Sequence, residues 1–159
     1  MRILGFDPGL ERIGVGVIDK EGSRITPVFY GLIQTPRISL PERLSILHEE
    51  ALSLLETHRP DTVATERQLF TVNKTTAMDV SKALGVLLLA VSRLHLPWAE
   101  YSPPEIKQSV VGNGAADKRQ VQFMVAKLLG LPAAPKPDDV ADALAIAICH
   151  AFRGGKMGG

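Results

Sequence analysis

The sequence has a single cysteine, few aromatic residues and no long hydrophobic run. Cys149 cannot form a disulfide within the chain or complete a zinc cluster, which is typical of proteins in a reducing compartment. The longest unbroken apolar stretch, Ala83 to Val91, covers nine residues, whereas a helix needs about 20 to cross a bilayer. The first residues lack the pattern of a signal peptide, since Asp7 interrupts them. We therefore expect a cytoplasmic protein with no transmembrane helix and no membrane partner.

Neither sign of charge is in excess. The chain has 18 Lys and Arg against 17 Asp and Glu, a net charge of +1, so its overall field attracts neither nucleic acid nor anionic membranes strongly. A basic surface for nucleic acid must then be local. The four histidines lie far apart and lack metal-ligand spacing, so we expect no histidine metal site: they are His48, His58, His95 and His150.

The apolar content is high enough for a folded core, because 45% of the 159 residues are hydrophobic. A chain of this length fits one domain. We expect residues 1–153 to form a single domain and the glycine-rich residues 154–159 to form a flexible tail.

The pattern of apolar residues predicts three strands followed by alternating helices and strands. The strands are expected at Arg2–Asp7, Ile13–Asp19, Arg24–Gln34, Thr62–Glu66 and Trp98–Tyr101, and the helices at 40–58, 73–94, 104–111, 117–129 and from 138 onward. The first three strands form an antiparallel meander. The order predicts an α/β fold, a five-stranded mixed sheet flanked by helices on both faces.

Two of these strands end in an acidic residue, Asp7 and Glu66. Right-handed crossover connections make the two strands parallel and place them side by side, so both carboxylates lie at one edge of the sheet. The last helix carries Asp139 and Asp142 at i, i+3, on one helical face. We therefore expect four acidic side chains to converge.

Each of these acids has a structural alternative on its own. Asp7 precedes Pro-Gly and suits a turn, and Asp139 and Asp142 near a helix start are favoured by the helix dipole. Asp138 stands where an N-cap belongs. The combination favours a site, because the last helix is apolar beyond Asp142 and buried acids need partners.

Converging carboxylates require cations or strongly raised pKa values. Ligand sets made only of oxygen favour Mg²⁺ or Mn²⁺ over zinc or copper. Two such ions about 4 Å apart can generate hydroxide and stabilise the leaving oxygen of a phosphodiester. Phosphodiester hydrolysis is therefore the expected chemistry.

Five sequence blocks and Glu66 closely resemble the RuvC family of bacterial Holliday-junction resolvases, in order and spacing over nearly the whole chain. The blocks are Gly5–Gly9 (GFDPG), Gly14–Ile18 (GVGVI), Lys107–Gly112 (KQSVVG), Ala116–Val121 (ADKRQV) and Asp139–Ala147 (DVADALAIA). The resemblance implies an RNase H-like fold and a homodimer that nicks opposed strands of four-way DNA junctions with two Mg²⁺ ions per site, Mn²⁺ being a substitute. It also implies contact with the RuvAB branch-migration complex.

The resemblance places the family's acidic residues on Asp7, Glu66, Asp139 and Asp142, with Asp138 outside the pattern. It places the two catalytic lysines on Lys107 and Lys118. A fixed ammonium group stabilises the charge that a pentacovalent phosphate gains in the transition state. The alternative is that both lysines are solvated surface residues.

The loop after Glu66 is expected to bind DNA. The family has an aromatic residue here that recognises the junction, and this chain offers Leu69 and Phe70, of which Phe70 is our choice. Base stacking on such a side chain contributes about 1 to 3 kcal/mol. A core position for Phe70 is the alternative. The other DNA-binding candidates are Asn73, Lys74 and Arg119.

The stretch Ala83 to Val91 is apolar on every helical face, so we expect one face to pack on the sheet and another on the same helix of a second chain. A helix enclosed within the monomer is the alternative.

Other functions are weighed against the junction nuclease. An actin-like or sugar-kinase phosphate-binding domain would open with a similar Asp-x-Gly loop at Asp7, but this chain has no second loop of that kind. A non-catalytic junction- or RNA-binding protein would not need all four acids. A general RNase H-like nuclease acting on RNA or RNA:DNA hybrids is the nearest enzymatic alternative.

Overall fold

The structure is a computed structural model of the chain that describes residues 1–67 and 74–154, with the backbone alone at Lys74. Its sheet has five strands in the order β3-β2-β1-β4-β5. The first three strands are antiparallel, and β4 and β5 run parallel to β1, which confirms the predicted mixed sheet. The strands are β1 (Arg2–Asp7), β2 (Arg12–Glu21), β3 (Arg24–Gln34), β4 (Thr62–Glu66) and β5 (Trp98–Tyr101).

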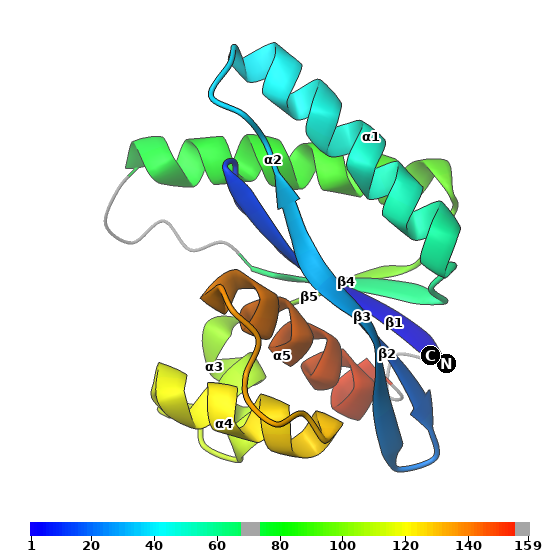
Figure 1. The fold of residues 1–159 in the computed structure, drawn as a ribbon, viewed down its shortest axis with the longest axis vertical. Coiled ribbons are helices and arrows are strands. Elements are labelled where there is room, and N and C mark those ends of the chain that lie inside the picture. Colours follow the sequence, from blue (N-terminus) through cyan, green and yellow to red (C-terminus); the bar gives the residue numbers. More distant parts are fainter. Residues whose placement is uncertain (68–73, 155–159) are drawn as a thin grey trace.

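Helices cover both faces of the sheet (Figure 1). One face carries α1 and α2, and the other carries α3, α4 and α5, which lie together below the sheet in Figure 1. The helices are α1 (Leu40–His58), α2 (Lys74–Arg93), α3 (Pro103–Val111), α4 (Lys118–Leu129) and α5 (Asp138–Arg153). The predicted bounds agree with these to within two residues at each end, apart from the unspecified end of α5.

Alternation along the strands divides the core in two, because successive side chains of a strand point to opposite faces. On β1, Leu4 and Phe6 are buried against the α1–α2 layer, and Ile3 is buried against the α5 layer. Which face a functional side chain occupies therefore follows from its position along the strand.

Local sequence sets most helix starts. Ser39 accepts a hydrogen bond from the backbone of Glu42 at the start of α1, and capping boxes open α3 (Ser102) and α4 (Asp117). The prediction of Asp138 as an N-cap is wrong. Pro137 holds that position without a side-chain bond, and Asp138 is the first helical residue, with a carboxylate that pairs with lysines instead of the helix backbone.

Helix α5 lies unusually close to the sheet, and glycines permit it. A Cβ at Gly16 would lie 2.8 Å from Leu144 Cδ2, and Cβ atoms at Gly5 and Gly14 would overlap the backbone carbonyls of Ala143 and Asp139. Three glycines at two neighbouring cross-strand positions of β1 and β2 thus let α5 pack against the strands.

A buried histidine ties the far end of α5 to the sheet. His150 Nδ1 lies 2.6 Å from the Tyr101 hydroxyl, and His150 Nε2 lies 3.2 Å from Thr62 Oγ1. Burial lowers the pKa of His150 and so favours the neutral ring. His150 thus packs and hydrogen-bonds within the core.

Helix α2 has an exposed side. Its buried residues are Ala83, Leu87, Ala90 and Val91, which share one helical stripe. Among the described residues, one helical stretch, Thr75–Arg93, is long and apolar enough to cross a membrane by length and composition, a candidate that the apolar-run criterion missed. Only 22% of that stretch is buried, and Leu89 remains 49% exposed.

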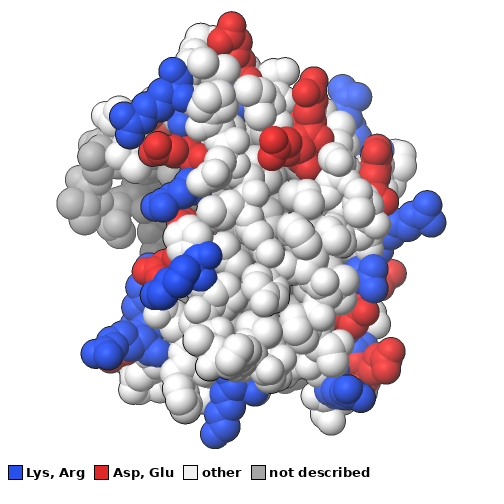
Figure 2. Space-filling model, viewed as in Figure 1, with Lys and Arg blue, Asp and Glu red and all other residues white. Residues whose placement is uncertain are grey.

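Charged side chains are dispersed on the face of the molecule drawn in Figure 1. Figure 2 shows Lys, Arg, Asp and Glu side chains mainly along the margins of this face, with an uncharged centre. No broad basic surface covers it, as the net charge of +1 leads one to expect.

Candidate active site

Asp7 and Glu66 stand beside each other at the carboxyl ends of β1 and β4. The parallel register pairs Gly5 with Ala64 and Phe6 with Thr65, so the next position on each strand is acidic. Both carboxylates point to the α5 face, because Gly5 and Ala64, two residues earlier, contact that layer. The predicted meeting of these two acids is confirmed.

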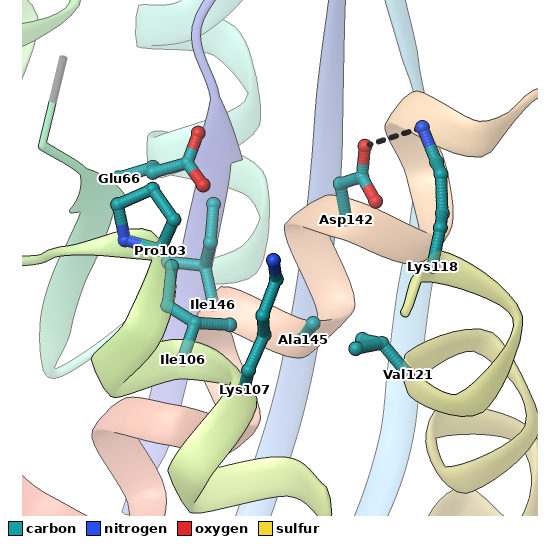
Figure 3. Close-up of a pocket in the computed structure, with 9 residues that line it drawn as sticks. All are labelled: Glu66, Pro103, Ile106, Lys107, Lys118, Val121, Asp142, Ala145 and Ile146. Carbon is teal, nitrogen blue, oxygen red and sulfur yellow. Dashed lines mark ion pairs between the residues drawn. The ribbon is translucent and has the colours of Figure 1, made fainter. Parts of the chain in front are cut away.

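The first turn of α5 brings Asp139 and Asp142 to the same edge. The α5 start lies against β2, since the Asp139 carbonyl occupies the space above Gly14. Asp142 lines a pocket of about 270 Å³ together with Glu66, Lys107 and Lys118. Figure 3 shows Glu66 and Asp142 on opposite sides of this pocket, with Lys107 extending between them.

The carboxylates influence one another electrostatically. Burial, followed by the charges of Asp142, Glu66 and Asp139, raises the pKa of Asp7 to about 8. Burial and Asp142 likewise raise the pKa of Glu66, whereas Lys107 and Lys118 oppose this rise. Burial also raises the pKa of Asp142, against the attraction of Lys118. The structure therefore brings together all four predicted acids in one electrostatic cluster.

Basic side chains neutralise part of this cluster. Lys118 Nζ lies 3.3 Å from Asp138 Oδ2 and 3.7 Å from Asp142 Oδ2. Arg12 Nε lies 3.6 Å from Asp139 Oδ2. No ion pair within residues 1–67 and 74–154 reaches Asp7, the acid with the most strongly raised pKa.

The donor chemistry of the cluster fits a divalent cation. Its donors are carboxylate oxygens, which Mg²⁺ and Mn²⁺ prefer, and Asp7 is a half-buried carboxylate with no ion-pair partner among the described residues. As placed, no three Asp, Glu, His or Cys side chains in the described part of the chain form a ready metal cage. Two of the four acids are instead directed toward Lys118 and Arg12.

The other predicted residues divide between the pocket and its surroundings. Lys107 on α3 and Lys118 at the start of α4 both line the pocket and extend toward it in Figure 3. Arg119, next to Lys118, is exposed and does not line it. The remaining DNA-binding candidates, Leu69, Phe70 and Asn73, and the side chain of Lys74, lie outside the described residues, as do positions 155–159 of the predicted tail.

Two basic residues of the site were missed from the sequence, Arg12 and Lys136. Lys136 Nζ lies 3.4 Å from Asp138 Oδ1, just before α5 begins. Arg12 could have been found by strand alternation, because it precedes Gly14 by two residues and therefore shares its face.

A mixed sheet of this order, with carboxylates at the ends of its neighbouring central strands and lysines opposite them, defines a class of protein. The chain is a nuclease with an RNase H-like fold.

Comparison with known proteins identifies the family within this class. The family model for "Crossover junction endodeoxyribonuclease RuvC" matches residues 3–150. The RuvC protein of Brevibacillus brevis is 52% identical over 152 residues, 95% of this chain and 92% of that protein. The RuvC protein of Thermotoga maritima is 48% identical, over 96% of this chain and 92% of that protein.

Solved structures agree. Thermus thermophilus RuvC in complex with a Holliday junction substrate superposes with a TM-score of 0.92 at 37% identity, covering 97% of this chain and 94% of that one. The chain belongs to the RuvC family, and it is a metal-dependent endonuclease that resolves Holliday junctions in DNA recombination and repair. This assignment displaces the phosphate-binding and non-catalytic alternatives.

Proposed function

We propose that Asp7, Glu66, Asp139 and Asp142 hold two Mg²⁺ ions, for which Mn²⁺ can substitute, at the scissile phosphate of a four-way junction. The single observation that carries this proposal is the position of Asp7. Its carboxylate is half-buried among three others and has a pKa raised to about 8. A pair of divalent ions would supply the missing positive charge, activate water and stabilise the leaving oxygen.

Lys107 and Lys118 are proposed to stabilise the negative charge of the pentacovalent phosphate. Both line the pocket that Glu66 and Asp142 border, and they come from two different helices, α3 and α4. Ammonium groups fixed on helices need little reorganisation as charge develops, which favours the transition state over the ground state.

The DNA-binding assignments rest on the family resemblance and on sequence position. Phe70, or Leu69 beside it, would stack on a base at the junction, and Asn73 and Lys74 would contact phosphates. Arg119 is exposed at the start of α4, one residue from Lys118, where it can reach DNA that passes the pocket. The Thermus thermophilus relative, solved in complex with a Holliday junction, supports junction binding by this chain.

A homodimer through α2 would match the symmetry of the junction. Met78, Lys82, Gly85 and Leu89 are exposed at i, i+4, i+7 and i+11, opposite the stripe that packs in the core. Two α2 helices related by a two-fold axis would bury this side of each helix. Each protomer would then place its acidic cluster at one of two opposed DNA strands of the junction. A cytoplasmic location and contact with the RuvAB complex are proposed from the family alone.

The test is cleavage of a synthetic four-way junction by the Asp7→Asn variant in Mg²⁺. We expect cleavage to be lost and junction binding to be largely retained, because the amide keeps the shape and removes the charge. Asp138→Asn is the matched control: Asp138 lies in the same cluster but outside the proposed ligand set, and its variant should still cleave. Full activity of Asp7→Asn would refute the assignment.

Substrate choice is tested with the same wild-type preparation. Junction, linear duplex and RNA:DNA hybrid are compared, and the nick positions are mapped. Symmetric nicks on opposed strands of the junction support a dimeric resolvase. Comparable cleavage of the hybrid would support a general RNase H-like nuclease instead.

A further inference from the structure

Arg12 is placed at the active site by the alternation of β2. Gly14 and Gly16 face α5, and Arg12 is the next residue on that face toward the carboxyl edge of β1. Its guanidinium Nε lies 3.6 Å from Asp139 Oδ2, and its side chain is 52% exposed. Arg12 therefore reaches the acidic cluster while remaining open to solvent.

Arg12 also borders a groove that runs over the start of α5. The groove has a volume of about 690 Å³, and its charged lining consists of three cations and three carboxylates: Arg12, Lys118, Lys136, Asp138, Asp139 and Asp142. Each of these carboxylates lies within 4 Å of at least one of these cations. The cations are thus engaged with the protein's own acids.

The Arg12–Asp139 ion pair would be weakened if Asp139 held a divalent ion. The ion and the Arg12 guanidinium carry like charges and would compete for the same carboxylate, so occupation of one disfavours the other. Because Arg12 lines the groove and is half exposed, a guanidinium released from Asp139 would still face the groove. An exposed arginine there is suited to a phosphate, which it can hold with two parallel hydrogen bonds.

We propose that Arg12 exchanges between Asp139 in the metal-free protein and a backbone phosphate of the junction when the ion is bound. This proposal rests on the proposed role of Asp139 as a metal ligand. Arg12 acts as a positioning residue that couples the two binding events: the ion releases the arginine to the DNA, and the DNA keeps the arginine away from the ion's ligand.

The first experiment measures Mn²⁺ binding to the DNA-free protein at low ionic strength, by the electron paramagnetic resonance signal of the free ion. We expect Arg12→Gln to lower the dissociation constant of Mn²⁺ by about two- to fivefold, in line with a part-exposed ion pair. Arg37→Gln is the matched control, because Arg37 pairs with Glu11 beside the same turn and should leave Mn²⁺ binding unchanged. Unchanged or weaker Mn²⁺ binding by Arg12→Gln would overturn the proposal.

Asp139→Asn separates this proposal from the one on which it rests. If that variant binds Mn²⁺ as wild type does, Asp139 is not a metal ligand and both proposals fail there. If it binds Mn²⁺ more weakly while Arg12→Gln matches wild type, the ligand role stands and the exchange fails.

The second experiment measures junction affinity in Ca²⁺ and in EDTA over a range of salt concentrations. We expect Arg12→Gln to weaken junction binding in Ca²⁺ more than in EDTA. The plot of log affinity against log salt concentration should also become less steep, by the amount that corresponds to the loss of about one phosphate contact. Equal losses in Ca²⁺ and EDTA, or no loss in either, would show that Arg12 does not move to a phosphate.

Discussion

The backbone carbonyl of Asp139 occupies the space that a Cβ atom would take at Gly14. This contact joins the first part of strand β2 to the first turn of α5. It sets how far Asp139 and Asp142 stand from Asp7, which pairs with Gly14 across the strands. The lack of a side chain at Gly14 on β2 thus determines where α5 places the carboxylates of Asp139 and Asp142.

Gly14→Ala is expected to displace the start of α5 and lower the free energy of unfolding by about 1–3 kcal/mol, as overpacked substitutions do. Cleavage per folded molecule should fall sharply, because the displaced turn carries two of the four acids. Urea unfolding and junction cleavage check this. Gly114→Ala is the comparison: a Cβ atom there would lie 3.4 Å from the Pro104 carbonyl oxygen, an ordinary van der Waals contact, so the free energy of unfolding should change little.

Asp7 should make the metal-free protein less stable as the pH rises. Its pKa is about 8 in the folded state against an ordinary value of 3.8, so between these values the folded state binds more protons than the unfolded state. The free energy of unfolding therefore falls with increasing pH through this window. Asp7→Asn removes the contribution and should be more stable than wild type by on the order of 2 kcal/mol at about pH 9, and by far less at about pH 5.

Thermal unfolding in EDTA at the two pH values measures this difference. Adding Mg²⁺ should raise the melting temperature of wild type at the higher pH, since a ligand that binds only the folded state stabilises it. The Asp7→Asn variant should respond much less. A variant less stable than wild type at high pH would contradict the electrostatic account of Asp7.

Lys118 and Lys136 should differ in their importance for cleavage. Both pair with Asp138, but Lys118 also lies 3.7 Å from Asp142 and lines the pocket with Glu66. Lys118→Gln should lower the rate of the chemical step by about 10²-fold, whereas Lys136→Gln should change it only a few-fold. Single-turnover cleavage measures the step directly, and equal effects would argue against a catalytic Lys118.

Leu89→Arg should produce a monomer if α2 forms the dimer interface. Leu89 is 49% exposed on α2 in the isolated chain, and a buried arginine there would lack a partner. Sedimentation velocity measures the change, and paired nicking of a junction should be lost with it. Phe123→Arg on α4, where the phenylalanine is 66% exposed, is the control and should remain dimeric. A dimeric Leu89→Arg variant would place the interface elsewhere.

Strand and helix positions were predictable because they depend on local patterns. The run that ends at Asp7 is short, apolar and closed by Pro-Gly, and the run that ends at Glu66 is short and rich in β-branched residues. Right-handed crossover then makes their strands neighbours. The i, i+3 spacing of Asp139 and Asp142 likewise puts both on one side of α5 without knowledge of the rest of the chain. Asp138 was misjudged because a capping position looks the same in sequence whether its carboxylate turns to the helix or to a lysine.

The order of strands and helices, the four acids and the family depend on residue type and spacing along the chain, so they could be predicted before the fold was known. The pairing of cations with acids became visible only in the folded chain. The pairing of Arg12 with Asp139 and of Lys118 with Asp142 joins residues far apart in the chain. Such contacts depend on how closely α5 approaches β2, and that distance is set by packing over glycine, which no local pattern specifies.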